Sequence, residues 1–185
     1  MRIEAFSEGK NLDAPEANED QFLVLPGRGY AVCDGATDIT GRESDGRRGG
    51  WLASRIAIQA VAAFLLDPAE RALQPERLID RISMSFRESY GRFGIMDIAR
   101  DDPARRFGAT LALAADLGDT FRFVLIGDSA LRINGTEVFV DDTGLDLVTA
   151  SLRVEAYRIV EAAGGGAEDR ARVGRACAFY GVAAL

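Results

Sequence analysis

The amino-acid sequence predicts a single α+β domain built on antiparallel β-sheet. Strand-like and helix-like patterns are segregated along the chain, in the order strands, two helices, strands, two helices, rather than alternating. Short turns join the strand-like segments, as they do between antiparallel neighbours. The 185 residues contain no internal repeat, low-complexity linker or composition shift that would mark a second domain. We therefore expect one domain over residues 1–185.

The first strands are predicted near the N-terminus. Residues 2–7 alternate apolar and polar side chains, as a half-buried strand does. Residues 21–25 and 30–33 are apolar runs on either side of the turn sequence Pro-Gly-Arg-Gly at 26–29, so they predict a β-hairpin. The polar, glycine-bearing segment 36–48 that follows is expected to be a loop.

Four segments have helical spacing of apolar residues. The first two cover residues 50–66 and residues 75 to about 90 or 99, and the second begins at a proline, which is favoured in the first helical turn. The last two cover residues 145–163 and 168–180, and three consecutive glycines separate them. These segments predict two helix pairs.

The central strands are predicted over residues 107–115, 120–126, 130–133 and 137–140. Asn134-Gly135 is a strong hairpin-turn sequence, because both positions tolerate positive φ angles. Gly127-Asp128-Ser129 predicts a tight turn. It could suggest an esterase nucleophile, but that chemistry needs a base, normally histidine, so we favour the turn.

The composition excludes several kinds of site. The sequence contains no histidine, which removes Ser-His-Asp catalysis, Cys-His catalysis and imidazole-ligated metals. A net charge of −7 makes nucleic acid an unexpected partner. The apolar stretch at residues 60–66 is too short to span a bilayer, so we expect no membrane segment and a cytoplasmic location. Cys33 and Cys177 are expected to be free thiols.

Acidic residues lie at the two strand ends that form the open end of the predicted hairpin. Glu19 and Asp20 open its first strand, and Asp34-Gly35 closes the second. In an antiparallel hairpin these ends lie side by side, and clustered carboxylates repel one another unless a cation compensates. Carboxylates with a backbone carbonyl and water suit Mg²⁺ or Mn²⁺. Aspartate and glycine are also common turn residues, so a simple turn cap is the alternative interpretation.

Five segments resemble, in the same order, motifs of the metal-dependent type 2C Ser/Thr protein phosphatases. They are residues 18–21 (Asn-Glu-Asp-Gln), 31–35 (Ala-Val-Cys-Asp-Gly), 50–54 (Gly-Trp-Leu-Ala-Ser), 107–111 (Phe-Gly-Ala-Thr-Leu) and 124–129 (Val-Leu-Ile-Gly-Asp-Ser). The resemblance implies a sandwich of two antiparallel sheets flanked by helix pairs. It also implies hydrolysis of phosphoserine and phosphothreonine in phosphorylated protein substrates, by water activated between two Mg²⁺ or Mn²⁺ ions.

The resemblance assigns roles to individual residues. It implies that Asp34 is the catalytic residue that bridges both metals, that Gly35 offers its carbonyl, and that Glu19 binds one metal. Asp20 would act as a metal ligand through water. Two further residues, Thr110 and Asp128, would be structural beneath the site.

The sequence also departs from the family pattern. The arginine that usually precedes the Asn-Glu-Asp motif to hold phosphate is missing, and Lys10 is the candidate in its place. Arg105 and Arg106 are further candidate phosphate contacts, with a solvated loop pair as the alternative. Ala36 stands where many members have a histidine.

The family's late Asp-Gly and Asp-Asn metal motifs are not found. We therefore expect a domain whose C-terminal part is missing and whose activity as given is weak or absent. The leading hypothesis is a phosphoprotein phosphatase of the short, bacterial-like type. The alternative is a non-catalytic pseudophosphatase or regulatory binding module.

Overall fold

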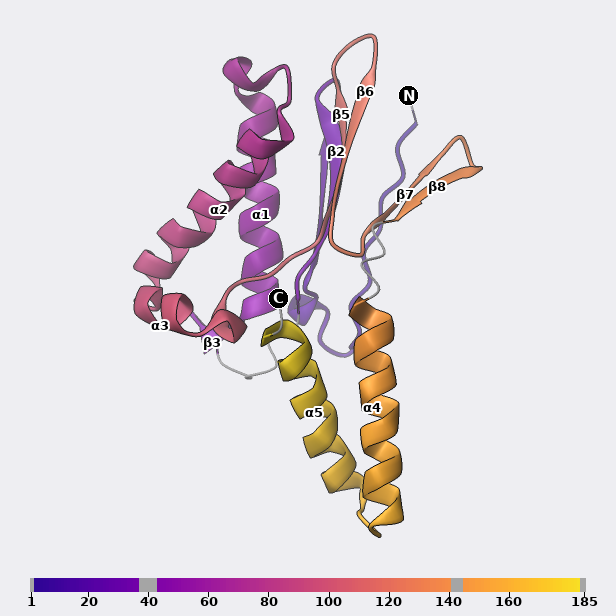
Figure 1. Cartoon of the computed structure of the whole chain (residues 1–185). Helices are drawn as coiled ribbons and strands as arrows, with labels where there is room; N and C mark the ends of the chain where they lie inside the picture. The colour runs from indigo at the N-terminus through magenta and orange to yellow at the C-terminus, as the bar shows by residue number, and fades with distance from the viewer. Residues whose placement is uncertain (1, 37–42, 141–144, 184–185) are drawn as a thin grey trace.

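The computed structural model describes residues 2–36, 43–140 and 145–183 (Figure 1). Its strands are β1 (Asp20–Leu25), β2 (Gly29–Asp34), β3 (Glu43–Ser44), β4 (Arg47–Arg48), β5 (Leu111–Asp116), β6 (Phe121–Ile126), β7 (Ala130–Ile133) and β8 (Glu137–Val140). Its α-helices are α1 (Gly49–Leu66), α2 (Pro75–Arg92), α3 (Met96–Asp101), α4 (Leu145–Ala162) and α5 (Ala167–Ala183). Three short 3₁₀ turns are η1 (Pro15–Ala17), η2 (Pro68–Glu70) and η3 (Pro103–Arg105).

One four-stranded antiparallel sheet organises the fold, in the strand order β1-β2-β5-β6. The β1–β2 hairpin is confirmed, and its register places Asp20 opposite Asp34 and Leu25 opposite Gly29. β7 and β8 form a separate two-stranded sheet. Their turn has positive φ at both Asn134 (51°) and Gly135 (74°), as the sequence predicted. The α+β class with antiparallel sheets and paired helices is confirmed.

Helix α1 covers one face of this sheet and contributes most to the core (Figure 1). Phe64 and Val61 of α1 are fully buried, and they pack in one cluster with Leu113 of β5 and Leu78 of α2. Among the described helices, α1 alone has the length and composition that could cross a membrane, and 56% of that stretch is buried inside the protein. The apolar stretch is thus longer than residues 60–66 suggested, and its packing in the core explains its composition.

A second buried cluster ties the segment before β5 to α2. The phenolic oxygen of Tyr90 accepts a hydrogen bond of 2.8 Å from the backbone N–H of Phe107. The Phe107 ring is surrounded by those of Tyr90, Phe86 and Phe93, at centroid distances of 4.9, 6.2 and 6.2 Å. These contacts fix the chain just before it reaches the edge of the sheet where the acidic residues lie.

Several element boundaries differ from the sequence-based predictions. The strand predicted at residues 2–7 is wrong, because this segment is exposed and has no strand partner among the described residues. The strand predicted from residue 107 begins at Leu111, although Ala109 makes an isolated bridge to Gly35. Gly94, with φ of 68°, ends the helical run and separates α2 from α3. The predicted loop at 36–48 contains the small β3–β4 hairpin, and its residues 37–42 lie outside the described part.

The C-terminal helix pair is close to the prediction. α4 and α5 pack against each other, and Gly164, with φ of 75°, ends the run between them. Figure 1 shows this pair extending away from the end of the four-stranded sheet that is opposite to the β5–β6 turn. The exposed side chains of α4 include the large apolar residues Leu147, Leu152 and Ile159.

Candidate functional site

The open end of the β1–β2 hairpin brings two carboxylates together. Asp20 is the first residue of β1 and Asp34 is the last of β2, and they are direct cross-strand partners. Directly opposed residues of an antiparallel pair point to the same face of the sheet, with Cβ atoms about 5 Å apart. Both side chains line a cavity of about 370 Å³, together with Glu8 and Ser129.

The electrostatics of this edge follow from that proximity. The pKa of Asp34 is raised from 3.8 to about 6, first by burial and then by a hydrogen bond and repulsion from Asp20. The charge of Asp128 raises the same pKa further, and Lys10 lowers it. Two carboxyl groups and one ammonium group therefore act on the Asp34 carboxyl at this edge. Such a cluster favours a bound cation.

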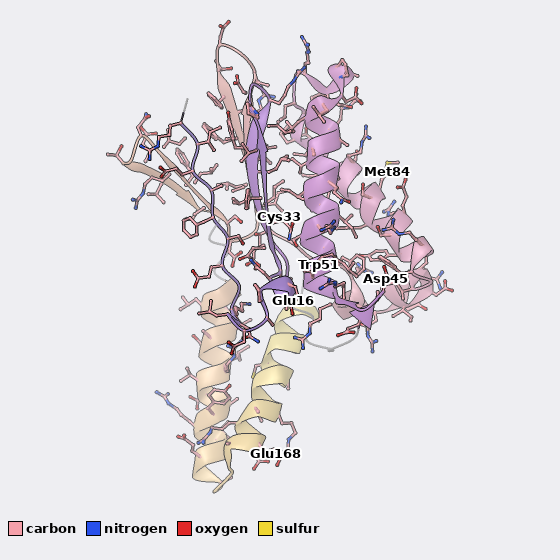
Figure 2. The ribbon with its side chains drawn as sticks, turned by 180° about the vertical axis from the view of Figure 1, so that it is seen from behind. Glu16, Cys33, Asp45, Trp51, Met84 and Glu168 are labelled. Atoms are coloured by element: carbon pink, nitrogen blue, oxygen red, sulfur yellow. The ribbon has the colours of Figure 1, made fainter. Side chains whose placement is uncertain are left out.

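Cys33 lies beside this cluster but faces the other side of the sheet. Figure 2 shows it between the strands and α1, and the residue is only 1% exposed. Burial raises the pKa of the thiol to about 12, and the charges of Asp34 and Asp20 add to the effect. The thiol is therefore unreactive at neutral pH. Both cysteines are free, as expected.

A close approach of two glycines holds the edge against α1. A Cβ atom added at Gly35 would lie 1.9 Å from the carbonyl oxygen of Gly50, so only glycine fits there. A Cβ added at Gly50 would lie 2.7 Å from Oε1 of Glu19, which places that carboxylate against the first turn of α1. The helix dipole favours negative charge at this position. Glu19 thus lies toward α1, on the other side of the strand from the Asp20–Asp34 pair.

Backbone and hydroxyl hydrogen bonds fix the position of Asp34. The backbone N–H of Thr110 donates to the carbonyl of Asp34 at 2.8 Å, and the N–H of Asp34 lies 3.3 Å from Oγ1 of Thr110. The same hydroxyl is 2.7 Å from Oγ of Ser129. Thr110 therefore links β2, the start of β5 and the turn after β6.

The Asn18 side chain fixes the start of β1, which lies opposite the Asp34 end of β2. Its Oδ1 accepts a hydrogen bond of 3.0 Å from the N–H of Asp20, and its Nδ2 donates to Ser7 at 2.7 Å. The backbone N–H of Gly35 donates to the carbonyl of Glu19 at 3.2 Å. These bonds hold both carboxylate-bearing residues on fixed backbone.

The two predicted arginines are engaged in structural contacts. Arg105 donates to Asp102 at 3.1 Å. Arg106 donates to the carbonyls of Ala99 and Arg100 at 2.8 and 3.2 Å, at the end of α3. Lys10 differs from them, because its charge acts on Asp34 directly.

The donor set at the Asp20–Asp34 edge fits a hard divalent cation in kind and in charge. Mg²⁺ keeps several waters and is commonly held by one or two carboxylates. The pair can supply those two, and Asp128 lies close enough for its charge to contribute. Across residues 2–36, 43–140 and 145–183, however, no three His, Cys, Asp or Glu side chains are grouped so that they could hold a metal ion.

Some site features were not evident from the sequence. Glu8 lines the cavity in front of the pair, although its segment was treated only as a loop. Gly50 was assigned to a motif and to the start of the first helix, but its contact with Gly35 was not expected: its carbonyl lies where a side chain on Gly35 would be. The consecutive glycines at 49 and 50 were the sequence signal for this contact, because glycine allows another backbone segment to approach closely.

The family profile described as protein phosphatase 2C matches residues 11–143. This segment contains the Asp20–Asp34 edge and all the motifs described above, and it covers more than half of the 185 residues. The chain belongs to the protein phosphatase 2C family. Searches of curated proteins and of solved structures gave no match. Helices α4 and α5 begin after the matched segment ends.

Proposed function

We propose that the chain is a metal-dependent phosphoprotein phosphatase whose centre is the Asp20–Asp34 pair. One observation carries the proposal. Two carboxylates on motif positions of the family are held face to face on rigid backbone, where burial, together with the hydrogen bond and the repulsion between them, raises the pKa of Asp34 to about 6. Family membership supports the reaction class, which is hydrolysis of a phosphate ester.

In this proposal Asp34 and Asp20 hold Mg²⁺ or Mn²⁺, and Gly35 lends its carbonyl. The bound metal would activate water and neutralise charge on the phosphate oxygens. Lys10 would attract the phosphate group of a phosphoserine or phosphothreonine side chain, because its positive charge acts at the same edge. Thr110 would keep Asp34 in place through its two hydrogen bonds.

The test is hydrolysis of nitrophenyl phosphate with and without Mn²⁺. We expect activity with Mn²⁺, loss of activity in chelator, and loss in Asp34→Asn. Asp80→Asn is the matched control, because Asp80 is an exposed carboxylate on α2. It should retain wild-type activity. Undiminished hydrolysis in chelator would refute the proposal.

A second candidate function is a non-catalytic binding module of the same family. It is favoured by the absence of a three-ligand metal group among the described residues and of histidine from the whole sequence. Manganese titration separates the two. Trp51, the only tryptophan, adjoins Gly50 at the start of α1, so its fluorescence can report binding at the neighbouring edge. Calorimetry that detects no Mn²⁺ binding would favour the binding module.

A further inference from the structure

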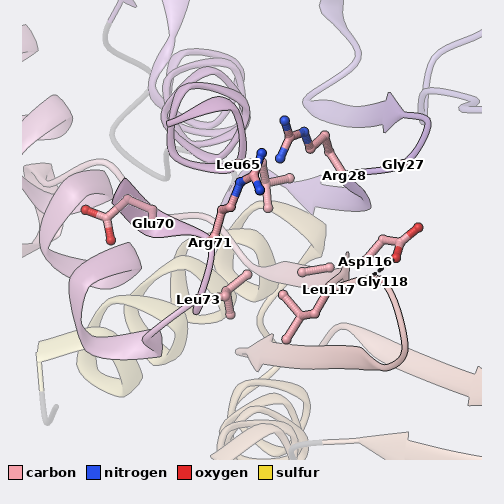
Figure 3. Close-up of a pocket in the computed structure, with 10 residues that line it drawn as sticks. Gly27, Arg28, Leu65, Glu70, Arg71, Leu73, Asp116, Leu117 and Gly118 are labelled. Carbon is pink, nitrogen blue, oxygen red and sulfur yellow. Dashed lines mark hydrogen bonds between the residues drawn. The ribbon is translucent and has the colours of Figure 1, made fainter. Parts of the chain in front are cut away.

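A second cavity lies at the other end of the β1–β2 hairpin. Its volume is about 380 Å³, and it is enclosed by the β1–β2 turn, the β5–β6 turn and the segment that follows α1 (Figure 3). Arg28 and Asp34 are six residue steps apart along β2, which corresponds to about 20 Å at about 3.4 Å per residue. It is therefore a separate place on the molecule.

Two arginines line this cavity. Figure 3 shows the side chains of Arg28, from the β1–β2 turn, and Arg71, from the segment after η2, in the same pocket. In the part of the chain that the structure describes, neither guanidinium group forms an ion pair with a carboxylate. Two unneutralised cations that share a cavity repel each other, and an anion between them removes that repulsion.

The two carboxylates in the cavity wall already have other partners. Glu70 is buried and forms an ion pair with Arg77 of α2. Oδ1 of Asp116 accepts a hydrogen bond of 2.9 Å from the N–H of Gly118, within the β5–β6 turn. The lining therefore contains two guanidinium groups and two carboxylates, and neither carboxylate forms an ion pair with Arg28 or Arg71 in the described residues.

The backbone that presents Arg28 is fixed by the turn. Its N–H donates to the carbonyl of Leu25 at 2.9 Å, and its carbonyl accepts from the N–H of Asp116 at 2.9 Å. Both ends of the residue are therefore hydrogen-bonded to sheet. The side chain projects from a rigid support.

The backbone that presents Arg71 is held just as firmly. The Arg122 guanidinium donates to the carbonyls of Ala72 and Leu73 at 3.0 and 2.8 Å. Leu73 is 1% exposed and keeps a positive φ of 42°, which a leucine adopts only when the surrounding structure holds it. The segment is thus pre-organised, although the Arg71 side chain itself is exposed.

We infer that this cavity binds a phosphate group, held between the guanidinium groups of Arg28 and Arg71. Guanidinium binds phosphate oxygens through paired N–H donors, and a dianion matches two such groups better than a single carboxylate does. The bearer of the group is either free inorganic phosphate or a phosphorylated peptide side chain. The inference does not depend on phosphatase activity, because the cavity shares no residue with the Asp20–Asp34 edge.

The test is calorimetric titration at constant ionic strength, in chelator and in an Asp34→Asn background, so that binding at the carboxylate edge is removed. The probes are inorganic phosphate, a phosphoserine peptide and the same peptide without phosphate. We expect Arg28→Gln and Arg71→Gln each to weaken phosphate binding by about tenfold or more, since each removes charged hydrogen bonds. Arg87→Gln is the matched control, because Arg87 is exposed on α2 and outside the cavity.

The outcomes separate the possible sources. Tighter binding of the phosphoserine peptide than of inorganic phosphate would identify a phosphorylated chain as the ligand, and equal binding would identify free phosphate. Failure to bind inorganic phosphate, together with equal binding of the two peptides, would overturn the inference. So would unchanged phosphate affinity in both arginine variants, with melting temperatures confirming that they fold.

Discussion

Replacing Asp34 by asparagine should stabilise the metal-free protein while it removes stabilisation by metal. The Asp34 carboxylate is held opposite Asp20 and close to Asp128, and the attraction of Lys10 offsets only part of their repulsion. Asparagine has nearly the same shape and no charge, so it keeps the backbone contacts with Thr110 and removes the repulsion. The variant should therefore be more stable than wild type in chelator, whereas only wild type should gain stability from Mn²⁺.

The magnitude follows from the pKa of Asp34. A rise from 3.8 to about 6 corresponds to about 3 kcal/mol when the folded protein is fully charged. Asp34 is solvent-exposed, so screening reduces the net effect, and we expect Asp34→Asn to raise the free energy of unfolding by about 1 kcal/mol at pH 7.5 in chelator. Asp20→Asn should also raise the free energy of unfolding, because either substitution removes the same repulsion. The double variant should therefore gain less than the sum of the two single variants.

The pH dependence has a definite sign. A carboxyl group whose pKa is raised on folding binds protons more tightly in the folded state, so stability falls as the pH rises between the two pKa values. The contribution of Asp34 should fall from about pH 4 to about pH 6 and then level off. The difference between Asp34→Asn and wild type should be near zero below about pH 4 and reach its full size above about pH 6.

Urea unfolding followed by circular dichroism measures this difference at several pH values. Asp80→Asn, an exposed carboxylate on α2, is the matched control and should change stability little. Adding Mn²⁺ should stabilise wild type and leave Asp34→Asn unchanged. The reasoning is wrong if Asp34→Asn is less stable than wild type in chelator at pH 7.5, or if the difference does not depend on pH.

Two further predictions each compare a pair of substitutions, one pair at glycines and one at tyrosines, and urea unfolding measures both. Gly35→Ala should cost about 3 kcal/mol or more, because the new Cβ would lie 1.9 Å from a backbone carbonyl of α1. Gly91→Ala, on the exposed side of α2 with open space around it, should instead stabilise by about 0.5 kcal/mol or more. Equal effects at the two glycines would contradict the close approach. Tyr90→Phe should cost about 1–3 kcal/mol, because it leaves the buried N–H of Phe107 without its acceptor. Tyr30→Phe removes a buried hydroxyl that has no hydrogen-bond partner among the described residues, so it should be neutral or stabilising.

The parts of the fold that could be predicted are those with local signals. The β1–β2 hairpin follows from two apolar runs around a proline-glycine turn, and Asn134-Gly135 fixes the β7–β8 turn. The strand predicted at residues 2–7 failed because alternation over six residues shows which side chains share a face, but not whether a partner strand exists. The break between α2 and α3 depends on Gly94, a residue that helices sometimes tolerate.

The candidate site was predictable to the same extent. Its two aspartates meet because hairpin register follows directly from the turn, so Asp20 and Asp34 could be paired from their spacing. The side of the strand on which the Glu19 carboxylate lies could not be predicted. It depends on the contact between Gly35 and Gly50, which joins the end of a strand to the start of a helix 15 residues later in the sequence. Contacts of this kind leave no periodic pattern in a sequence.

The arrangement of the Asp20–Asp34 edge is better explained by function than by stability. The hydrogen bonds of Thr110 and Asn18, and the glycine contact with α1, hold the two strand ends firmly in place. All of this rigidity keeps two carboxylates together at a partly buried edge, where burial and their repulsion raise the pKa of Asp34 and lower stability at neutral pH. Neutral side chains at the two aspartate positions would preserve the same backbone bonds without that penalty. Fixed contacts that hold an unfavourable charge pair are expected where a divalent cation offsets the repulsion, and this is the physical argument for our proposal that these two carboxylates bind one.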